Sequence, residues 1–254
     1  MKTATRAQWI AVVAVGVLAL WVYRPTLSHH SLKVRGFESI ALASSLAEGK
    51  GFSDPFQTLP TGPSAQLAPV YPAVIAVCMR LFGEHAGDVL VYLNWVLLAV
   101  QLMLLPLLAS QLGLGFWAGV LAVVGWFATG IPPIYIVEST LAALVIVTTA
   151  LVMSQSFSAS LSRIGAASAA VLWGSLILMQ PVAVLIFPVW LWVWHREFPD
   201  RSRRQMAVLI VAIFLVSPWI VRNYAVFIAS FLFAIISGLN WPHRTTGARI
   251  PFFQ

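Results

Sequence analysis

The chain has 254 residues, of which 60% are apolar and only 9% are charged, and its formal net charge is +7. Soluble domains usually carry about 25% charged residues, so this chain has too few charges to cover a soluble globule, which excludes a cytosolic enzyme, a coiled coil and a disordered chain. The composition predicts an integral membrane protein, in which basic residues between apolar stretches set orientation or contact lipid head groups rather than nucleic acid.

The first apolar stretch covers residues 7–23, close to the length of about 20 residues that a spanning helix needs. Lys2 and Arg6 precede it, as basic residues precede the apolar part of a secretory signal peptide. A signal peptide ends in small residues, whereas positions 21–23 are the bulky Trp-Val-Tyr. We therefore expect a retained membrane anchor.

Residues 24–87 form a long loop that is rich in charged and turn-forming residues. Within it, an apolar stripe with helical spacing predicts a short amphipathic helix that lies on the membrane and stops at Gly49 and Gly51. The stripe consists of Phe37, Ile40, Ala41, Ser44 and Ala47. Residues 67–82 are apolar but interrupted by two prolines and Arg80, which favours an interfacial or re-entrant helix over a span.

Further spans are expected where uncharged apolar runs are long enough, at 89–112, 114–134, 138–157 and 206–221. The run at 164–194 is too long for one crossing and contains two prolines, so we expect a hairpin near Gln180 and Pro181. Residues 224–239 are also uncharged and leave an eighth span open. The sequence thus predicts an all-α fold, a multi-pass transmembrane bundle of about seven spans with a long outer first loop containing short amphipathic helices.

The orientation follows from the short connections between spans, where Lys and Arg favour the cytoplasmic side. The connection at 195–205 carries four arginines. When seven spans alternate, it lies on the same side as the N-terminus, so we expect a cytoplasmic N-terminus. The loop 24–87, Glu138 and the tail after Arg222 then face outside, together with most of the acidic residues.

Two acidic residues are candidates for chemistry at this outer surface. Glu38 lies on the predicted amphipathic helix, where it is either a solvated charge or a functional carboxylate. Glu138 begins an apolar span after a Pro-Pro pair at 132–133. Ionisable groups at span edges are functional or reach toward water, and a carboxylate also stabilises a helix N-terminus. Both roles therefore stay open for Glu138.

Basic residues on the outer side are candidates for contact with phosphate. Arg222 and Asn223 end a span there; a guanidinium fork suits a phosphate diester, and the alternative is an interfacial anchor. A second basic cluster, which contacts lipid head groups or a lipid phosphate, consists of His29, His30, Lys33 and Arg35. Adjacent histidines rarely face one metal ion, so no metal site is predicted there, although the two acids leave a divalent cation open as an alternative.

Four stretches, spaced along the chain, resemble the GT-C superfamily of membrane glycosyltransferases. They are FESIALASSLAEGKGFSDPF, PTGPSAQLAPVYPAVIAVCMRLFG, YIVESTL and PWIVRNYAVF. The chain is most similar to the branch of protein-mannosyltransferases and aminoarabinose transferases, from about residue 7 to Phe227. The resemblance predicts a transmembrane module over residues 1–227 and leaves an unassigned outer tail at 228–254.

The resemblance implies a sugar donor linked to a polyprenyl phosphate and an acceptor hydroxyl on the outer face of a bacterial-type inner membrane. The commonest acid in this loop of the relatives is an Asp four residues before a Tyr, a register that holds Arg35 and Ser39 here. Glu38 lies near the same helical face, and some bacterial members carry a Glu at this position, so Glu38 is implied as catalytic. Relatives have a second acid at the position of Glu138.

Two alternatives remain beside an active transferase. Relatives usually continue with further spans and a soluble portion, so we expect either a truncated member, which transfers sugar poorly by itself, or a minimal module. The runner-up is a non-catalytic relative that binds the lipid carrier or is a scaffold for a partner. A transporter is disfavoured, because it would carry charges near the middle of the membrane and paired broken helices.

Overall fold

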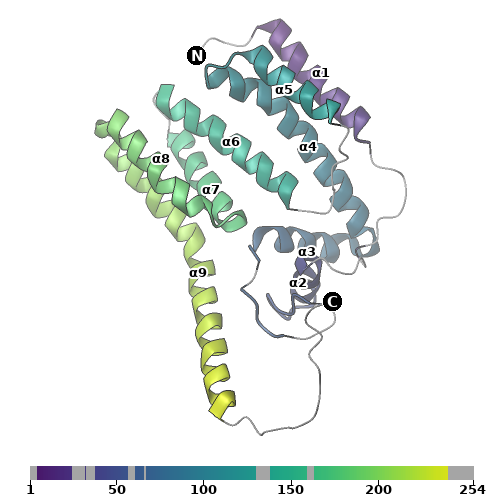
Figure 1. Ribbon diagram of the computed structural model, residues 1–254, viewed down its shortest axis with the longest axis vertical. Coiled ribbons are helices and arrows are strands. Elements are labelled where there is room, and N and C mark those ends of the chain that lie inside the picture. Colours follow the sequence, from purple (N-terminus) through teal and green to yellow (C-terminus); the bar gives the residue numbers. More distant parts are fainter. Residues whose placement is uncertain are drawn as a thin grey trace.

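The computed structural model of the chain describes residues 5–24, 32, 38–56, 61–65, 67–129, 138–158 and 163–239. Regular structure in these parts is helical, apart from one isolated antiparallel bridge between Ser53 and Pro63. The all-α class that the sequence predicts is therefore confirmed (Figure 1).

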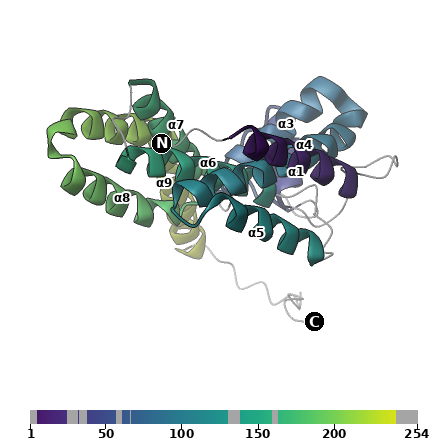
Figure 2. The same cartoon turned by 90° about the horizontal axis from the view of Figure 1, so that it is seen from above.

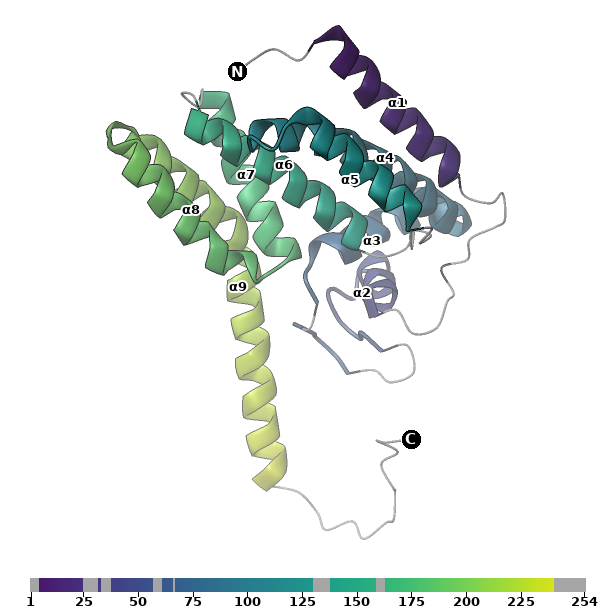
Figure 3. The same cartoon turned by 45° about the horizontal axis from the view of Figure 1, so that its top comes forward.

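A helix occupies each of the seven positions where a span is predicted. They are α1 (Arg6–Val22), α4 (Ala86–Gln111), α5 (Phe116–Ala128), α6 (Ser139–Ser158), α7 (Arg163–Met179), α8 (Ala183–Glu197) and α9 (Ser202–Leu239). The gap between α7 and α8 confirms the hairpin expected near Gln180 and Pro181. Successive helices run alternately up and down, so the start of α1 and the turn between α8 and α9 lie at one end, while α2 and α3 lie at the other (Figures 1 and 3).

Within the residues that the structure describes, two helical stretches are long and apolar enough to cross a membrane, namely Val70–Gln111 with 42 residues and Pro199–Ile228 with 30. The first consists of α3 (Val70–Phe82), the 3-10 turn η1 (Gly83–His85) and α4. It bends at Gly83, whose φ is 53°, so α3 lies across the end of α4 (Figure 1). α4 alone has 26 residues, about 39 Å at 1.5 Å per residue. Crossing by the other helices stays a prediction.

α9 is a single helix of 38 residues, about 57 Å long at 1.5 Å per residue. Its C-terminal part extends beyond the other helices (Figures 1 and 3). Pro218 is accommodated inside the helix. Residues 224–239 therefore continue α9 and do not form a separate eighth helix, and the boundary expected after residue 227 lies within it.

Aromatic side chains hold α7 and α8 together. Trp190 and Trp194 stack one turn apart on α8 with ring centroids 5.1 Å apart, and Trp173 of α7 packs on Trp190 at 5.5 Å. None of the three is more than 3% exposed. Large aromatic rings bury about 150–250 Å² each, so this stack dominates the apolar contact between the two helices. These three tryptophans are therefore packing residues of the core.

The helices form two groups that lie side by side. α1, α4 and α5 pack on one side and α7, α8 and α9 on the other, with α6 between them in contact with α4 and α7 (Figure 2). In the first group, Ala19, Leu102 and Val123 are almost fully buried and belong to one cluster.

α2 (Glu38–Ala47) is the short helix predicted in the first loop. The chain leaves it through Gly49 and Gly51, which have φ angles of 80° and 79°, a conformation that glycine adopts without strain. Arg80 of α3 donates to the carbonyl oxygens of Leu46 and Ala47 at 2.8 and 3.1 Å. These bonds satisfy the last carbonyls of α2 with a cation, which the helix dipole also favours.

α2 is buried more deeply than a helix lying flat on a membrane surface. Leu42 and Ala43, which are outside the predicted stripe, are both 0% exposed. α3 packs closely against α2. The buried surface of α2 is therefore wider than the single apolar stripe expected from the sequence.

Gly119 is the closest contact between α5 and α4. A Cβ there would lie 2.5 Å from Pro106 Cα and 2.7 Å from the Leu105 carbonyl oxygen, and both are main-chain atoms. We expect Gly119→Ala to lower the thermal-unfolding midpoint of the detergent-solubilised protein, because overpacking typically costs about 1–3 kcal/mol.

Gly125→Ala is the matched control in the same helix, since nothing lies within 4 Å of a Cβ at that position. This variant should keep or raise the midpoint, because Ala favours a helix over Gly by about 1 kcal/mol. Equal losses in both variants would contradict the close packing of α4 and α5.

Candidate functional site

Glu38 is the first residue of α2 and is partly exposed. Its carboxylate lies at the positive end of the helix dipole, where an acidic side chain stabilises the helix. Two residues later, Ile40 is 2% exposed and packs against Tyr71 and its apolar neighbours. Glu38 thus lies at the edge of a packed cluster, and its catalytic role stays a prediction.

Glu138 lies directly before α6, and its main-chain carbonyl accepts a hydrogen bond from the Ala142 amide at 2.9 Å. This is the first i→i−4 bond of α6, so Glu138 occupies the N-cap position. Its side chain is partly exposed and lies within electrostatic range of the Tyr71 hydroxyl. Both roles of its carboxylate, at the helix N-terminus and in chemistry, stay predictions.

One apolar cluster brings the beginnings of α2 and α6 together. We call it the Tyr71 cluster; its buried members are Ile40, Ala43, Tyr71, Ile75, Ala76, Cys78, Ala86 and Leu90. Leu141, three residues after Glu138, packs against the same cluster. Helices that carry the two candidate acids thus meet at one end of the bundle (Figures 1 and 3). The sequence predicts both acids at one outer surface, and we further predict that their carboxyl groups face one cavity there.

Two buried oxygen atoms interact beside this cluster, the Tyr71 hydroxyl and Asn94 Oδ1, and within the described part of the chain neither makes a hydrogen bond of good geometry. Tyr71 and Asn94 are 3% and 2% exposed. The Asn94 amide nitrogen donates to the Leu90 carbonyl at 2.9 Å, which holds the side chain against α4. An unsatisfied buried polar group costs about 1–3 kcal/mol. The Tyr71 hydroxyl and Asn94 Oδ1 therefore form a buried polar site near Glu138.

Tyr71 and Asn94 are not among the site residues that the sequence pattern predicts. A signal was present, since Asn94 is a polar residue in the apolar run that forms α4, and polar residues inside such runs are often functional. Its meeting with Tyr71 depends on the bend at Gly83, which the sequence pattern does not specify.

Arg222 joins α9 to the first loop. Its Nη1 donates to the carbonyl oxygen of Ser64 and its Nη2 to that of Phe52, both at 2.6 Å. The guanidinium also lies over the rings of Phe52 and Trp219, at 5.2 and 4.9 Å from their centroids. These acceptors are neutral, so the contacts hold Arg222 in place and leave its positive charge uncompensated.

The loop that Arg222 holds is stabilised by its own hydrogen bonds. Asp54 Oδ1 accepts from the amides of Thr61 and Gly62 at 2.9 and 2.8 Å, and the Asp54 amide donates to the Gly62 carbonyl at 2.9 Å. The Ser64 amide donates to the Phe52 carbonyl at 3.0 Å. Arg222 therefore binds the two residues that close this hairpin-like loop.

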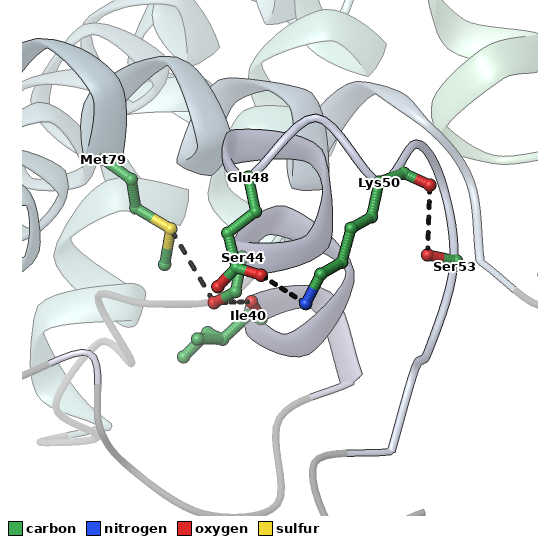
Figure 4. A network of polar contacts seen from close by, with 6 residues as sticks. All are labelled: Ile40, Ser44, Glu48, Lys50, Ser53 and Met79. Atoms are coloured by element: carbon green, nitrogen blue, oxygen red, sulfur yellow. Dashed lines mark hydrogen bonds and ion pairs between the residues drawn. The ribbon is translucent and has the colours of Figure 1, made fainter. Parts of the chain in front are cut away.

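A polar network connects α2, α3 and the start of the same loop (Figure 4). The Ser44 hydroxyl lies 3.0 Å from the Ile40 carbonyl, to which it donates, and 3.9 Å from the Met79 sulfur. Lys50 pairs with Glu48 at 2.6 Å. This hydrogen-bonded carboxylate raises the pKa of Lys50. Both side chains are well exposed, so this pair contributes little to stability.

The other predicted binding residues have different outcomes. Asn223 accepts a hydrogen bond from Arg222 Nη1 at 3.1 Å and so belongs to the same contact. The predicted basic cluster lies outside the described residues. Its members are His29, His30, Lys33 and Arg35. Among residues that the structure describes, no three His, Cys, Asp or Glu side chains lie close enough to hold a metal ion.

Comparison with protein families, with curated proteins and with solved structures finds no match to this chain.

Arg222→Gln is expected to loosen the loop, because hydrogen bonds to a charged group are worth about 1.5–3 kcal/mol each. The amides of Asp54 and Ser64, which donate within the loop, should exchange with deuterium several-fold faster in this variant. Asn223→Ala is the control, since Arg222 keeps both carbonyl partners in it. Unchanged exchange in Arg222→Gln would show that the contact does not hold the loop.

Proposed function

We propose that the chain is an integral membrane protein that transfers a sugar from a polyprenyl-phosphate carrier to an acceptor hydroxyl on the outer face of a bacterial-type inner membrane. The observation that carries the proposal is the convergence of α2 and α6 on the Tyr71 cluster. Each of these helices begins at an acid that the GT-C resemblance implies as catalytic, Glu38 or Glu138.

The proposed orientation places this cluster outside. The turn at 195–205, with its four arginines, lies at the opposite end of the bundle from α2 and α3 (Figure 1). Short connections rich in Arg favour the cytoplasm. The helices at the seven predicted spans would therefore cross the membrane with the N-terminus inside. The apolar stretch Pro199–Ile228 supports at least one such crossing.

The proposed reaction is an in-line displacement at the anomeric carbon of the sugar. The acceptor oxygen forms a bond to this carbon while the bond from the carbon to the phosphate oxygen breaks, and the electron pair leaves with the lipid phosphate. The acceptor proton passes to a carboxylate, for which we propose Glu38, with Glu138 as the second candidate. A positioned general base typically contributes about 10² to 10⁴ in rate.

Arg222 would stabilise the charge that develops on the departing phosphate. Its guanidinium is held by neutral carbonyl acceptors, and charge-assisted hydrogen bonds to phosphate are about twice as strong as neutral ones. The existing bonds already have a charged donor, and a phosphate oxygen would add the negative charge that the carbonyl acceptors lack. Asn223 lies beside Arg222 as a second polar contact.

The second candidate function is a non-catalytic relative that binds the lipid carrier or is a scaffold for a partner. Engagement of Arg222 with the main chain of the loop favours this alternative in part, because it gives the residue a structural role without any substrate. The two candidate functions predict different results for sugar transfer, and both predict binding of polyprenyl phosphate.

Glu38→Gln should abolish most sugar transfer while binding of the carrier stays. The assay uses the purified full chain in lipid vesicles with labelled polyprenyl-phosphate sugars and mixed hydroxyl acceptors. It measures release of polyprenyl phosphate, and carrier binding is measured separately. Glu48→Gln is the matched control, since Glu48 pairs with Lys50 at the surface. Loss in Glu138→Gln alone would make Glu138 the base, and binding without turnover by the unmodified chain would favour the non-catalytic candidate.

Labelling of single cysteines tests the orientation. In a Cys78→Ser background, Ala65→Cys and Ser202→Cys place exposed thiols at opposite ends of the bundle. A membrane-impermeant maleimide should label Ala65→Cys in intact cells and Ser202→Cys only after permeabilisation. The reverse pattern would contradict the proposed outer site.

A further inference from the structure

The turn between α8 and α9 is a second charged surface, far from the Tyr71 cluster. Residues 195–205, which we call the arginine turn, contain four arginines and only two acids. Three of these arginines are well exposed, Arg196, Arg203 and Arg204. None of them has a part in the proposed sugar transfer.

Exposed apolar side chains flank these arginines. Trp192, one helical turn before Arg196, is 61% exposed, and Met206, next to the arginine pair, is 55% exposed. Exposed Trp beside basic residues is typical of the level at which membrane head groups meet the hydrocarbon. A surface that binds nucleic acid or an acidic protein would not need apolar side chains directed outward at its margin.

Buried hydrogen bonds hold the arginine turn in a fixed shape. Gln205 is 6% exposed, its Oε1 lies 2.9 Å from His195 Nδ1, and its Nε2 donates to the Phe198 carbonyl at 3.2 Å. The Phe198 amide donates to the carbonyl of the fully buried Trp194 at 3.0 Å. The arginines are thus presented on a turn anchored in the aromatic core.

Aromatic rings orient two of the guanidinium groups. Arg196 lies over Trp192 at 5.9 Å from the ring centroid, and Arg201 lies over Phe198 at 4.4 Å. A cation over an aromatic face is attracted by the quadrupole of the ring, but the ring carries no net charge. The positive potential of the turn therefore persists.

We propose that the arginine turn binds the phosphate diester head groups of anionic phospholipids. The apolar stretch that is able to cross a membrane begins at Pro199, which places Arg203 and Arg204 within its first residues, at head-group depth. Guanidinium forks suit phosphate diesters. The proposal rests on membrane insertion, as the proposed function does, and it is independent of sugar transfer.

The test compares two lipids on the full chain in a neutral detergent. Phosphatidylglycerol and phosphatidylcholine are added in mixed micelles, and bound lipid is counted by native mass spectrometry. The unmodified chain should prefer phosphatidylglycerol at least tenfold, because each basic residue near an anionic surface contributes about fivefold in binding. The preference should shrink in high salt.

Arg203→Gln/Arg204→Gln should lose most of this preference. Arg24→Gln/Lys50→Gln is the matched control, since it removes two exposed charges at the other end of the bundle and should keep the preference. Arg203→Lys/Arg204→Lys keeps the charge and should retain most of it, which separates charge from misfolding. The proposal fails if the unmodified chain binds both lipids equally, or if the glutamine pair and the control behave alike.

Glu38→Gln separates this proposal from the proposed function. That variant should keep the lipid preference whether or not it transfers sugar. If sugar transfer is lost while the preference for phosphatidylglycerol stays, lipid binding by the arginine turn is supported. If the enzyme is active but shows no such preference, only the proposed lipid binding is overturned. Tighter binding of a short single-stranded DNA than of phosphatidylglycerol at physiological salt would also overturn it.

Discussion

The arrangement of the first loop and α2 depends on hydrogen bonds from two arginines to main-chain carbonyl oxygens. Arg80 donates to the last carbonyls of α2, and Arg222 donates to the carbonyls of Phe52 and Ser64 in the loop. An unpaired carbonyl is costly where its residue is buried, as Phe52 and Ser64 are. Cations from neighbouring helices therefore hold the first loop and α2, and with α2 the position of Glu38.

The positions of the helices could be predicted from the sequence, because long apolar runs separated by Gly, Pro or charged residues leave few alternatives. The hairpin at Gln180 and Pro181 is one such case. The continuity of α9 could not be predicted, since the Arg222–Asn223 pair has the pattern of a span end, and only the packed helix shows that it continues. The depth of α2 depends on cover by its own loop, which periodicity does not describe.

For the candidate site, the sequence predicts single residues. The geometry of the site depends on contacts between residues that lie far apart in the chain. Glu38 was predicted on the amphipathic helix and Glu138 at the start of a span; Glu38 is the first residue of α2, and Glu138 directly precedes α6. The shared Tyr71 cluster and the contact between Tyr71 and Asn94 arise from the bend at Gly83, a single residue with positive φ. The contacts of Arg222 join positions far apart in the chain, and no local pattern encodes such a pairing.

The unbroken course of α9 couples the two ends of the molecule mechanically. Arg204 and Arg222 lie on the same helix, about 27 Å apart along its axis at 1.5 Å per residue. Because Arg222 donates to the carbonyl oxygens of Phe52 and Ser64, a tilt of α9 at the arginine turn would also shift its contact with the first loop. Under the proposed lipid binding, α9 would connect the lipids at the arginine turn to the loop at the other end of the bundle.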